Sequence, residues 1–105
     1  QQLYEERGWI IGPDANRGYR RMVPSPRPQK IVEAPAIKAL VQAGHIILCG
    51  GGGGVPVKTV DQHLLRGVEA VIDKDFTSCL LAQTLGIDNV LICTEVEHAY
   101  LHYGQ

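Results

Sequence analysis

The sequence has no excess of charge of either sign. Ten basic residues stand against eleven acidic ones among 105 residues, for a formal net charge of −1. A chain without a basic field has no long-range attraction for nucleic acid or for an anionic membrane. We therefore expect neither as a partner, so that function must reside in local sites for small molecules.

Long hydrophobic runs, leader features and paired cysteines are also missing. No apolar run approaches the roughly 20 residues of a membrane helix, and the first residues lack the basic start and apolar stretch of a signal peptide. Three cysteines, Cys49, Cys79 and Cys93, form an odd number without CxxC spacing and lie in apolar surroundings. These features predict buried free thiols in a cytoplasmic protein.

Hydrophobic spacing and turn residues predict two helices among short strands. Residues 35–43 have apolar side chains on one helical face, with a proline in the first turn and Gly44 at the end. A second helix is predicted over 75–85, ending at Gly86. Short strands or apolar runs are predicted over 9–11, 19–23, 30–32, 45–49, 55–60, 63–65, 68–72 and 89–93.

The order of these elements predicts an α/β fold. Helix, strand and loop recur twice, which is typical of a mainly parallel sheet flanked by helices on both faces. We expect one partial domain over 1–105, in which 1–29 form a hairpin and a proline-rich linker and 30–105 carry the site. The chain opens inside what reads as a polar helix end and stops at residues 103–105 without a polar tail, which predicts a fragment or a truncated gene product.

Five consecutive glycines, Gly50 to Gly54, follow the predicted strand 45–49. A loop without side chains lets the oxygens of a phosphate or carboxylate approach the backbone amides closely, but such a run is as typical of a mobile or sharp turn. A P-loop is excluded because Lys58 follows valine. The dinucleotide fingerprint is excluded because Val55 stands where its third glycine belongs.

Asp73, Lys74 and Asp75 lie between an apolar run and the second predicted helix. Two carboxylates beside a compact cation can keep a lysine charged and directed at a phosphoryl group. A solvated turn that caps the helix is the alternative. Position favours a site, because ligands of open α/β sheets bind at the ends of strands.

Further polar residues follow the last predicted strand. Thr94 and Glu95 suit contacts with a nucleotide, although an ordinary loop would have the same composition. His98 and His102 would share a metal only in a helix, and solvent-exposed histidines are the favoured interpretation. The sequence therefore predicts no direct metal ligand. The arginines at 17, 20, 21 and 27 are expected to form a solvated face.

Four segments together resemble the carbamate kinases of the amino acid kinase superfamily. They are RGYRRMVPSP at 17–26, the glycine loop with VPV at 50–57, GVEAVIDKD at 67–75, and residues 91–104. They occur in the order of the family and cover nearly the whole chain. The combination of GGGGVPV and GVEAVIDKD is the most specific part of the resemblance.

The resemblance implies an open α/β sandwich, a homodimer of arginine metabolism, and reversible phosphoryl transfer between ATP and carbamate to give ADP and carbamoyl phosphate, with Mg²⁺ accompanying the nucleotide. It implies that Lys74 neutralises the transferred group and that Asp75 organises the active-site lysines. The implied nucleotide- or substrate-binding residues are Gly51, Gly52, Gly53, Gly54, Asp73, Thr94, Glu95 and Tyr100.

Departures from the family limit this expectation. Glu95 and Glu97 stand where the family usually has aspartates, and the glycine run is one residue longer than usual. The other phosphate loop and the further lysines of the family have no counterpart in this chain. Because phosphoryl transfer needs several charges positioned at once, we expect negligible activity from Lys74 alone. The alternative is a non-catalytic nucleotide-binding or dimerisation remnant of an amino acid kinase, and a third possibility is another acyl-phosphate-forming kinase.

Overall fold

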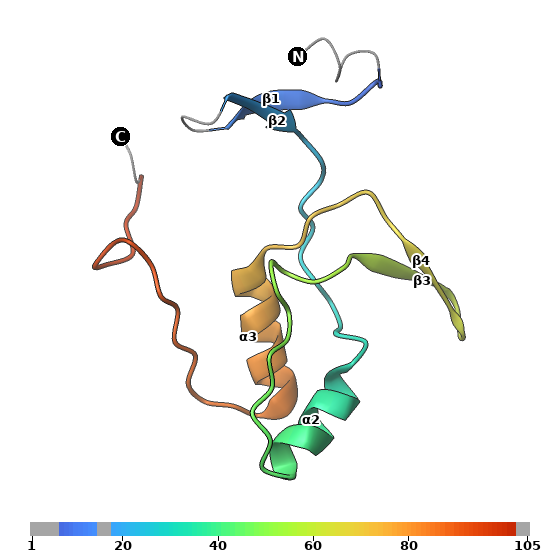
Figure 1. The fold of residues 1–105 in the computed structure, drawn as a ribbon, viewed down its shortest axis with the longest axis vertical. Coiled ribbons are helices and arrows are strands. Elements are labelled where there is room, and N and C mark those ends of the chain that lie inside the picture. The colour runs from blue at the N-terminus through green and yellow to red at the C-terminus, as the bar shows by residue number, and fades with distance from the viewer. Residues whose placement is uncertain (1–6, 15–17, 103–105) are drawn as a thin grey trace.

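The computed structural model describes residues 7–14 and 18–102. Two small hairpins extend from a pair of helices, and long loops join them (Figure 1). The elements in chain order are β1 (Ile11–Asp14), β2 (Gly18–Arg21), α2 (Ala34–Gln42), β3 (Val57–Asp61), β4 (Leu64–Gly67) and α3 (Lys74–Leu85). Neither helix of the described residues has the length and apolar character needed to cross a bilayer.

Both hairpins overlap pairs of predicted strands, 9–11 with 19–23 and 55–60 with 63–65, with shifted bounds. In the first, Ile11 lies opposite Arg21, and in the second, Val57 lies opposite Gly67. The second hairpin has an irregular register before its turn. There the Asp61 carboxylate accepts a hydrogen bond of 2.9 Å from the backbone N–H of residue 63, a bond by which aspartate commonly closes turns.

Helix α3 begins and ends at capping residues of the kinds that the sequence predicts. Asp73 is its N-cap, and the carboxylate accepts a hydrogen bond of 2.7 Å from the backbone N–H of Asp75. Gly86 ends the helix in the left-handed conformation, at φ 71°, with its N–H directed to the carbonyls of the last turn. Helix α2 likewise has a proline in its first turn, where no backbone donor is lost.

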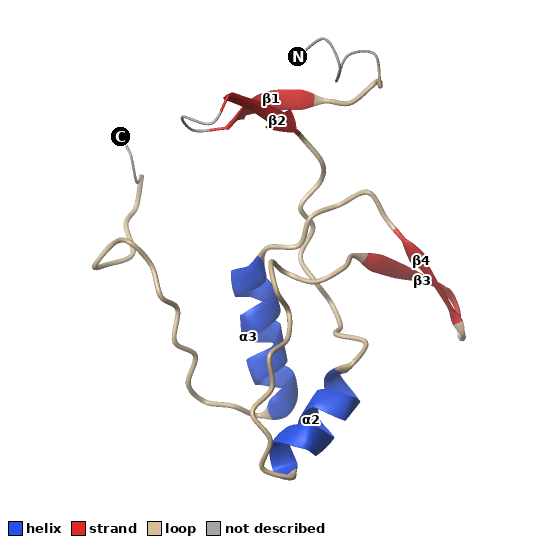
Figure 2. Ribbon diagram, viewed as in Figure 1, coloured by secondary structure: helices blue, strands red, loops and turns tan. Residues whose placement is uncertain are grey.

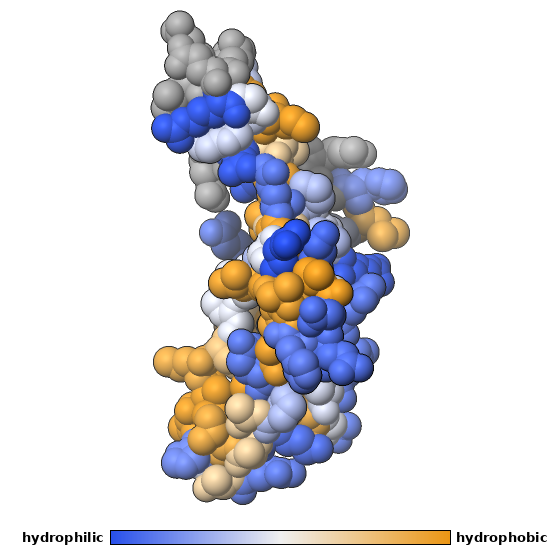
Figure 3. Space-filling model, turned by 90° about the vertical axis from the view of Figure 1, so that its right-hand side faces the viewer, coloured by the Kyte–Doolittle hydropathy of each residue, from blue (hydrophilic) through white to orange (hydrophobic). Residues whose placement is uncertain are grey.

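The buried core is small and lies where α2 contacts α3. Its buried side chains are Ala34 and Ile37 from α2 and Thr77 and Ala82 from α3. The chain exposes 9342 Å², whereas a compact monomer of this mass would expose about 5,800 Å². Its radius of gyration is 17.2 Å, against about 13 Å for a compact domain of this length. Much apolar surface therefore faces solvent, and hydrophobic residues lie among hydrophilic ones on the face shown in Figure 3.

The predicted strands 30–32, 45–49 and 89–93 and the run 68–72 form no ladder among the described residues. They lie as extended loops (Figure 2). The two sheets present are antiparallel pairs, so the α/β content is confirmed while the mainly parallel sheet is not. The physical reason is that a strand requires a neighbouring strand for its N–H and C=O groups, and among the described residues no strand pairs with these segments. Segment 68–72 forms isolated backbone bonds only, such as that from the Val71 N–H to the Pro24 carbonyl. Ile46 is accordingly 96% exposed and Leu91 91% exposed.

The three cysteines are free, as predicted, but the prediction of burial is wrong. Cys49, Cys79 and Cys93 are all exposed. Two of them belong to apolar segments that lack a covering layer, and the third lies on the outer face of α3. An apolar sequence neighbourhood indicates a tendency to be buried, but burial also requires a second layer of structure.

The N-cap gives a first test of the helix. We expect Asp73→Ala to lower the free energy of unfolding by about 1 kcal/mol, because the N–H of Asp75 loses its acceptor, whereas Asp73→Ser should retain most of the stability. Urea unfolding followed by helical circular dichroism measures the change. Asp88→Ala, in the exposed loop after α3, is the control, and an equal loss in both alanine variants would contradict the capping role.

Candidate functional site

The glycine loop, residues 50–54, packs closely against the segment that leads into α3. Gly53 is buried, and its N–H donates a hydrogen bond of 2.9 Å to the Gly50 carbonyl, which closes a tight turn. A Cβ on Gly53 would lie 1.8 Å from the carbonyl oxygen of Ile72, and the residue has φ 134°. Both the space and the backbone conformation therefore require glycine at this position.

Thr77 joins this loop to the first turn of α3. Its hydroxyl donates a hydrogen bond of 2.7 Å to the Gly53 carbonyl, and this contact is buried. The same oxygen lies 3.3 Å from the Asp73 carbonyl. Thr77 is absent from the site residues that the sequence predicts. The four-residue spacing from Asp73 to a threonine indicates the local contact, but no sequence signal identifies Gly53 as the long-range acceptor.

The three charged residues before and at the start of α3 have different tasks. Asp73 caps the helix, whereas the Asp75 carboxylate accepts a hydrogen bond of 2.9 Å from Lys74 Nζ. This hydrogen bond and the negative charge of Asp75 raise the pKa of Lys74 above its ordinary value, with a smaller contribution from Asp73. Lys74 is exposed and remains cationic at neutral pH. A cation at the positive end of a helix suits an anionic ligand.

The proline-rich linker lies against the same region. The Val71 N–H donates a hydrogen bond of 2.9 Å to the Pro24 carbonyl, and the Arg27 guanidinium lies 4.9 Å from the centre of the Phe76 ring. Arg21, on β2, forms an ion pair with Glu69. Two of the arginines that we expected on a solvated face thus have partners. An open cavity of about 970 Å³ lies beside the linker and the glycine loop, with Arg27, Lys30 and Lys58 among its lining residues.

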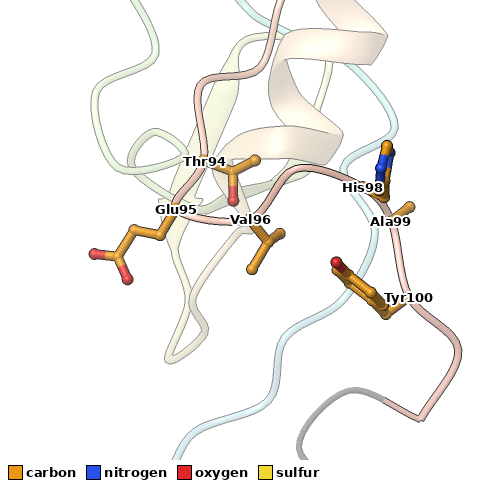
Figure 4. Close-up of a pocket in the computed structure, with 6 residues that line it drawn as sticks. All are labelled: Thr94, Glu95, Val96, His98, Ala99 and Tyr100. Carbon is orange, nitrogen blue, oxygen red and sulfur yellow. The ribbon is translucent and has the colours of Figure 1, made fainter.

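A second cavity, of about 400 Å³, lies in the segment after the last extended stretch (Figure 4). Its lining residues are Thr94, Glu95, Val96, His98, Ala99 and Tyr100. In Figure 4 the Glu95 carboxylate points away from the other labelled side chains. Three predicted nucleotide contacts thus line one cavity, but neither the glycine loop nor the start of α3 contributes to it. The structure brings Gly53 and Asp73 together, and it leaves the Thr94 group apart from them.

The histidines of this segment form no metal site in the part of the chain that the structure describes. No group of three histidine, cysteine or acidic side chains gathers there with a geometry suited to a metal ion. The His98 ring instead meets the Tyr100 ring edge to face, with 6.5 Å between the ring centres.

The glycine loop and the start of α3 lie in a region of the chain that matches a known family. The model of the "Amino acid kinase family" matches residues 6–103. The chain belongs to the amino acid kinase family. The glycine loop and the charged start of α3 both lie within the matched region.

Similar proteins of the amino acid kinase family are much longer than this chain. A carbamate kinase-like protein of Escherichia coli is 50% identical over 97 residues, which are 92% of this chain and 31% of that protein. The crystal structure of a protein from Aeropyrum pernix K1 matches with a TM-score of 0.81 and 40% identity, over 99% of this chain and 33% of that one.

A carbamate kinase from Giardia lamblia bound to AMP-PNP matches with a TM-score of 0.65 and 45% identity, over 80% of this chain and 27% of that one. The chain spans about a third of the length of the curated relatives that it matches.

The Lys74–Asp75 bond predicts a shift that titration can measure. Asp75→Asn removes the carboxylate that stabilises the charged lysine, so the pKa of Lys74 should fall toward the ordinary value of about 10.4. Heteronuclear NMR of the lysine side chain follows the titration. The measurement starts at pH 8 and covers the ~3 pH units around the ordinary pKa of lysine. Asp73→Asn keeps a capping side chain and should lower the pKa less; a larger fall in this variant would refute the assignment.

The buried turn predicts that two neighbouring glycines differ in their tolerance of a side chain. Gly53→Ala should cost at least about 1–3 kcal/mol of unfolding free energy from backbone strain alone, and the clash with Ile72 adds to this. Gly52→Ala is the matched control, because a Cβ there meets nothing within 4 Å, and it should change stability by about 0.5 kcal/mol or less. Equal unfolding midpoints of the two variants in urea would contradict the close packing.

Proposed function

We propose that this chain forms part of a carbamate kinase, which transfers a phosphoryl group reversibly between ATP and carbamate to give ADP and carbamoyl phosphate. One observation carries the proposal: the cationic Lys74 stands at the N-terminus of α3, beside a glycine loop that Thr77 holds in place. The similarity to proteins named carbamate kinase over nearly the whole chain supports the choice of substrate.

In this proposal Lys74 neutralises the phosphoryl group during transfer. Phosphoryl transfer requires little covalent chemistry from the protein, and fixed positive charge and backbone donors supply most of the stabilisation. Asp75 orients Lys74 through the 2.9 Å hydrogen bond. The amides of Gly51, Gly52 and Gly54 donate no hydrogen bond to any other described residue, so they are free to bind phosphate or carbamate oxygens.

Thr94, Glu95 and Tyr100 are assigned to the nucleotide, because they line a cavity of their own. The described residues hold no cluster of ligands for a metal ion, so we assign Mg²⁺ to the nucleotide phosphates and not to this chain. When bound, the ion would neutralise phosphate charge.

We assign the mainly parallel sheet that the sequence predicts to the fold of the proposed complete enzyme. Residues 45–49, 68–72 and 89–93 would be its strands, with 30–105 carrying the site and 1–29 connecting to it. Nearly full exposure of Leu48, at 98%, and of Leu91, at 91%, supports this proposal, since such side chains are stable when covered. A homodimer in the cytoplasm, serving arginine metabolism, is proposed from the resemblance alone.

Two assays of ATP formation from ADP and carbamoyl phosphate test the function. The 105-residue chain should show no turnover above background, because one lysine cannot stabilise the transferred charge alone. A chimera in which this chain replaces the matching third of the carbamate kinase from Pyrococcus furiosus, 49% identical over 104 residues, should turn over. Lys74→Met in the chimera should lower kcat at least about 100-fold.

The parent enzyme and gel filtration provide the controls. A chimera that elutes like the parent but forms no ATP would refute the proposed function. Calorimetry of the chain with ADP and Mg²⁺ then distinguishes the remaining alternatives: saturable heat indicates a nucleotide-binding module, and its absence indicates a structural remnant. Robust turnover by the chain alone would contradict the requirement for further lysines.

A further inference from the structure

We propose that Thr77 is a positioning residue that fixes the glycine loop over the start of α3, so that the loop amides and Lys74 face the same anion. The identity of that anion rests on the proposed function. The contact itself does not, because it is a property of the folded chain. Thr77 is 8% exposed and makes a buried hydrogen bond to a residue 24 positions earlier in the chain.

Thr77 bonds one end of the tight turn, and its methyl group lies near the other. Its hydroxyl donates to the Gly53 carbonyl at 2.7 Å, and its methyl carbon lies 3.7 Å from the position that a Cβ on Gly50 would occupy. The turn between these ends is closed by the hydrogen bond from Gly53 N–H to the Gly50 carbonyl. Thr77 therefore bonds one end of the turn, and its methyl group occupies the space beside the other end.

The place of Thr77 on the helix explains why this contact matters for Lys74. The two residues lie three positions apart on α3, and side chains at that spacing are neighbours on one face of a helix. The loop is thus held one turn from the cation. A glycine-rich loop without such a contact would become ordered only when the ligand binds. The entropy lost in ordering the loop would then weaken binding, and the loop amides would not be preorganised for the ligand.

Three variants separate the hydroxyl from the methyl group and from a general effect on the helix. Thr77→Val keeps the shape and removes the donor, and Thr77→Ser keeps the donor and removes the methyl group. Thr84→Val is the matched control, since the exposed Thr84 hydroxyl donates at 2.7 Å to a carbonyl four residues earlier on the same helix. Its hydrogen bond goes to Leu80 and not to the glycine loop.

Amide hydrogen exchange of the 105-residue chain provides the readout that is independent of activity. In Thr77→Val, exchange at the Gly53 N–H should accelerate at least about 10-fold relative to the amides in the middle of α3, because the loop loses its only side-chain donor in the described contacts. In Thr77→Ser it should stay within about 3-fold of the original chain, and in Thr84→Val it should not change.

The chimera supplies the catalytic readout. Thr77→Val should lower kcat about 10-fold or more at a temperature well below its unfolding midpoint, and Thr77→Ser should restore most of it. Unchanged Gly53 exchange in Thr77→Val, or a serine variant that behaves like the valine one, would overturn the proposal. An inactive but folded chimera would instead refute the proposed function, and the exchange experiment would still decide the role of Thr77.

Discussion

The close approach of Gly53 to the Ile72 carbonyl is the constraint on which the rest of the site depends. A backbone that passes so near another backbone excludes every side chain at this position. The approach fixes the loop relative to the end of the 68–72 segment, and α3 starts directly after that segment. Thr77 can therefore reach the Gly53 carbonyl, and Lys74 directly follows the Asp73 backbone that the loop approaches.

Asp73, Lys74 and Asp75 show that a helix cap and a lysine–carboxylate ion pair are compatible in three residues. The sequence leaves a capping turn and a phosphoryl-transfer site as alternatives; the structure contains the cap and the ion pair, and the site remains a proposal. Asp73 satisfies a backbone donor at the start of α3, which leaves Asp75 to bind Lys74. The cap also sets where the helix begins. It therefore determines the position of the Lys74 backbone, from which the lysine side chain extends.

The parts of the fold that are local in sequence could be predicted, and the non-local parts could not. Gly86 and Asp73 mark the ends of α3 through contacts within a few residues, and the hairpins follow from turn chemistry in the same way. The strand pattern of 45–49 indicates only that the segment tends to be buried. It contains no information about which neighbour would pair with it, and the described chain supplies none. Gly53 as the acceptor for Thr77 escaped prediction for the same reason, since 24 residues separate the two.

The exposed extended segment before the glycine loop has a consequence for the behaviour of the chain in solution. Ile46 and Leu48 are 96% and 98% exposed in a stretch whose backbone groups form no ladder in the described structure. Short apolar β-prone stretches with free edges are templates for intermolecular pairing and aggregation. The segment 45–49 would therefore drive self-association at high concentration. Any structure that covers this segment would keep the chain soluble.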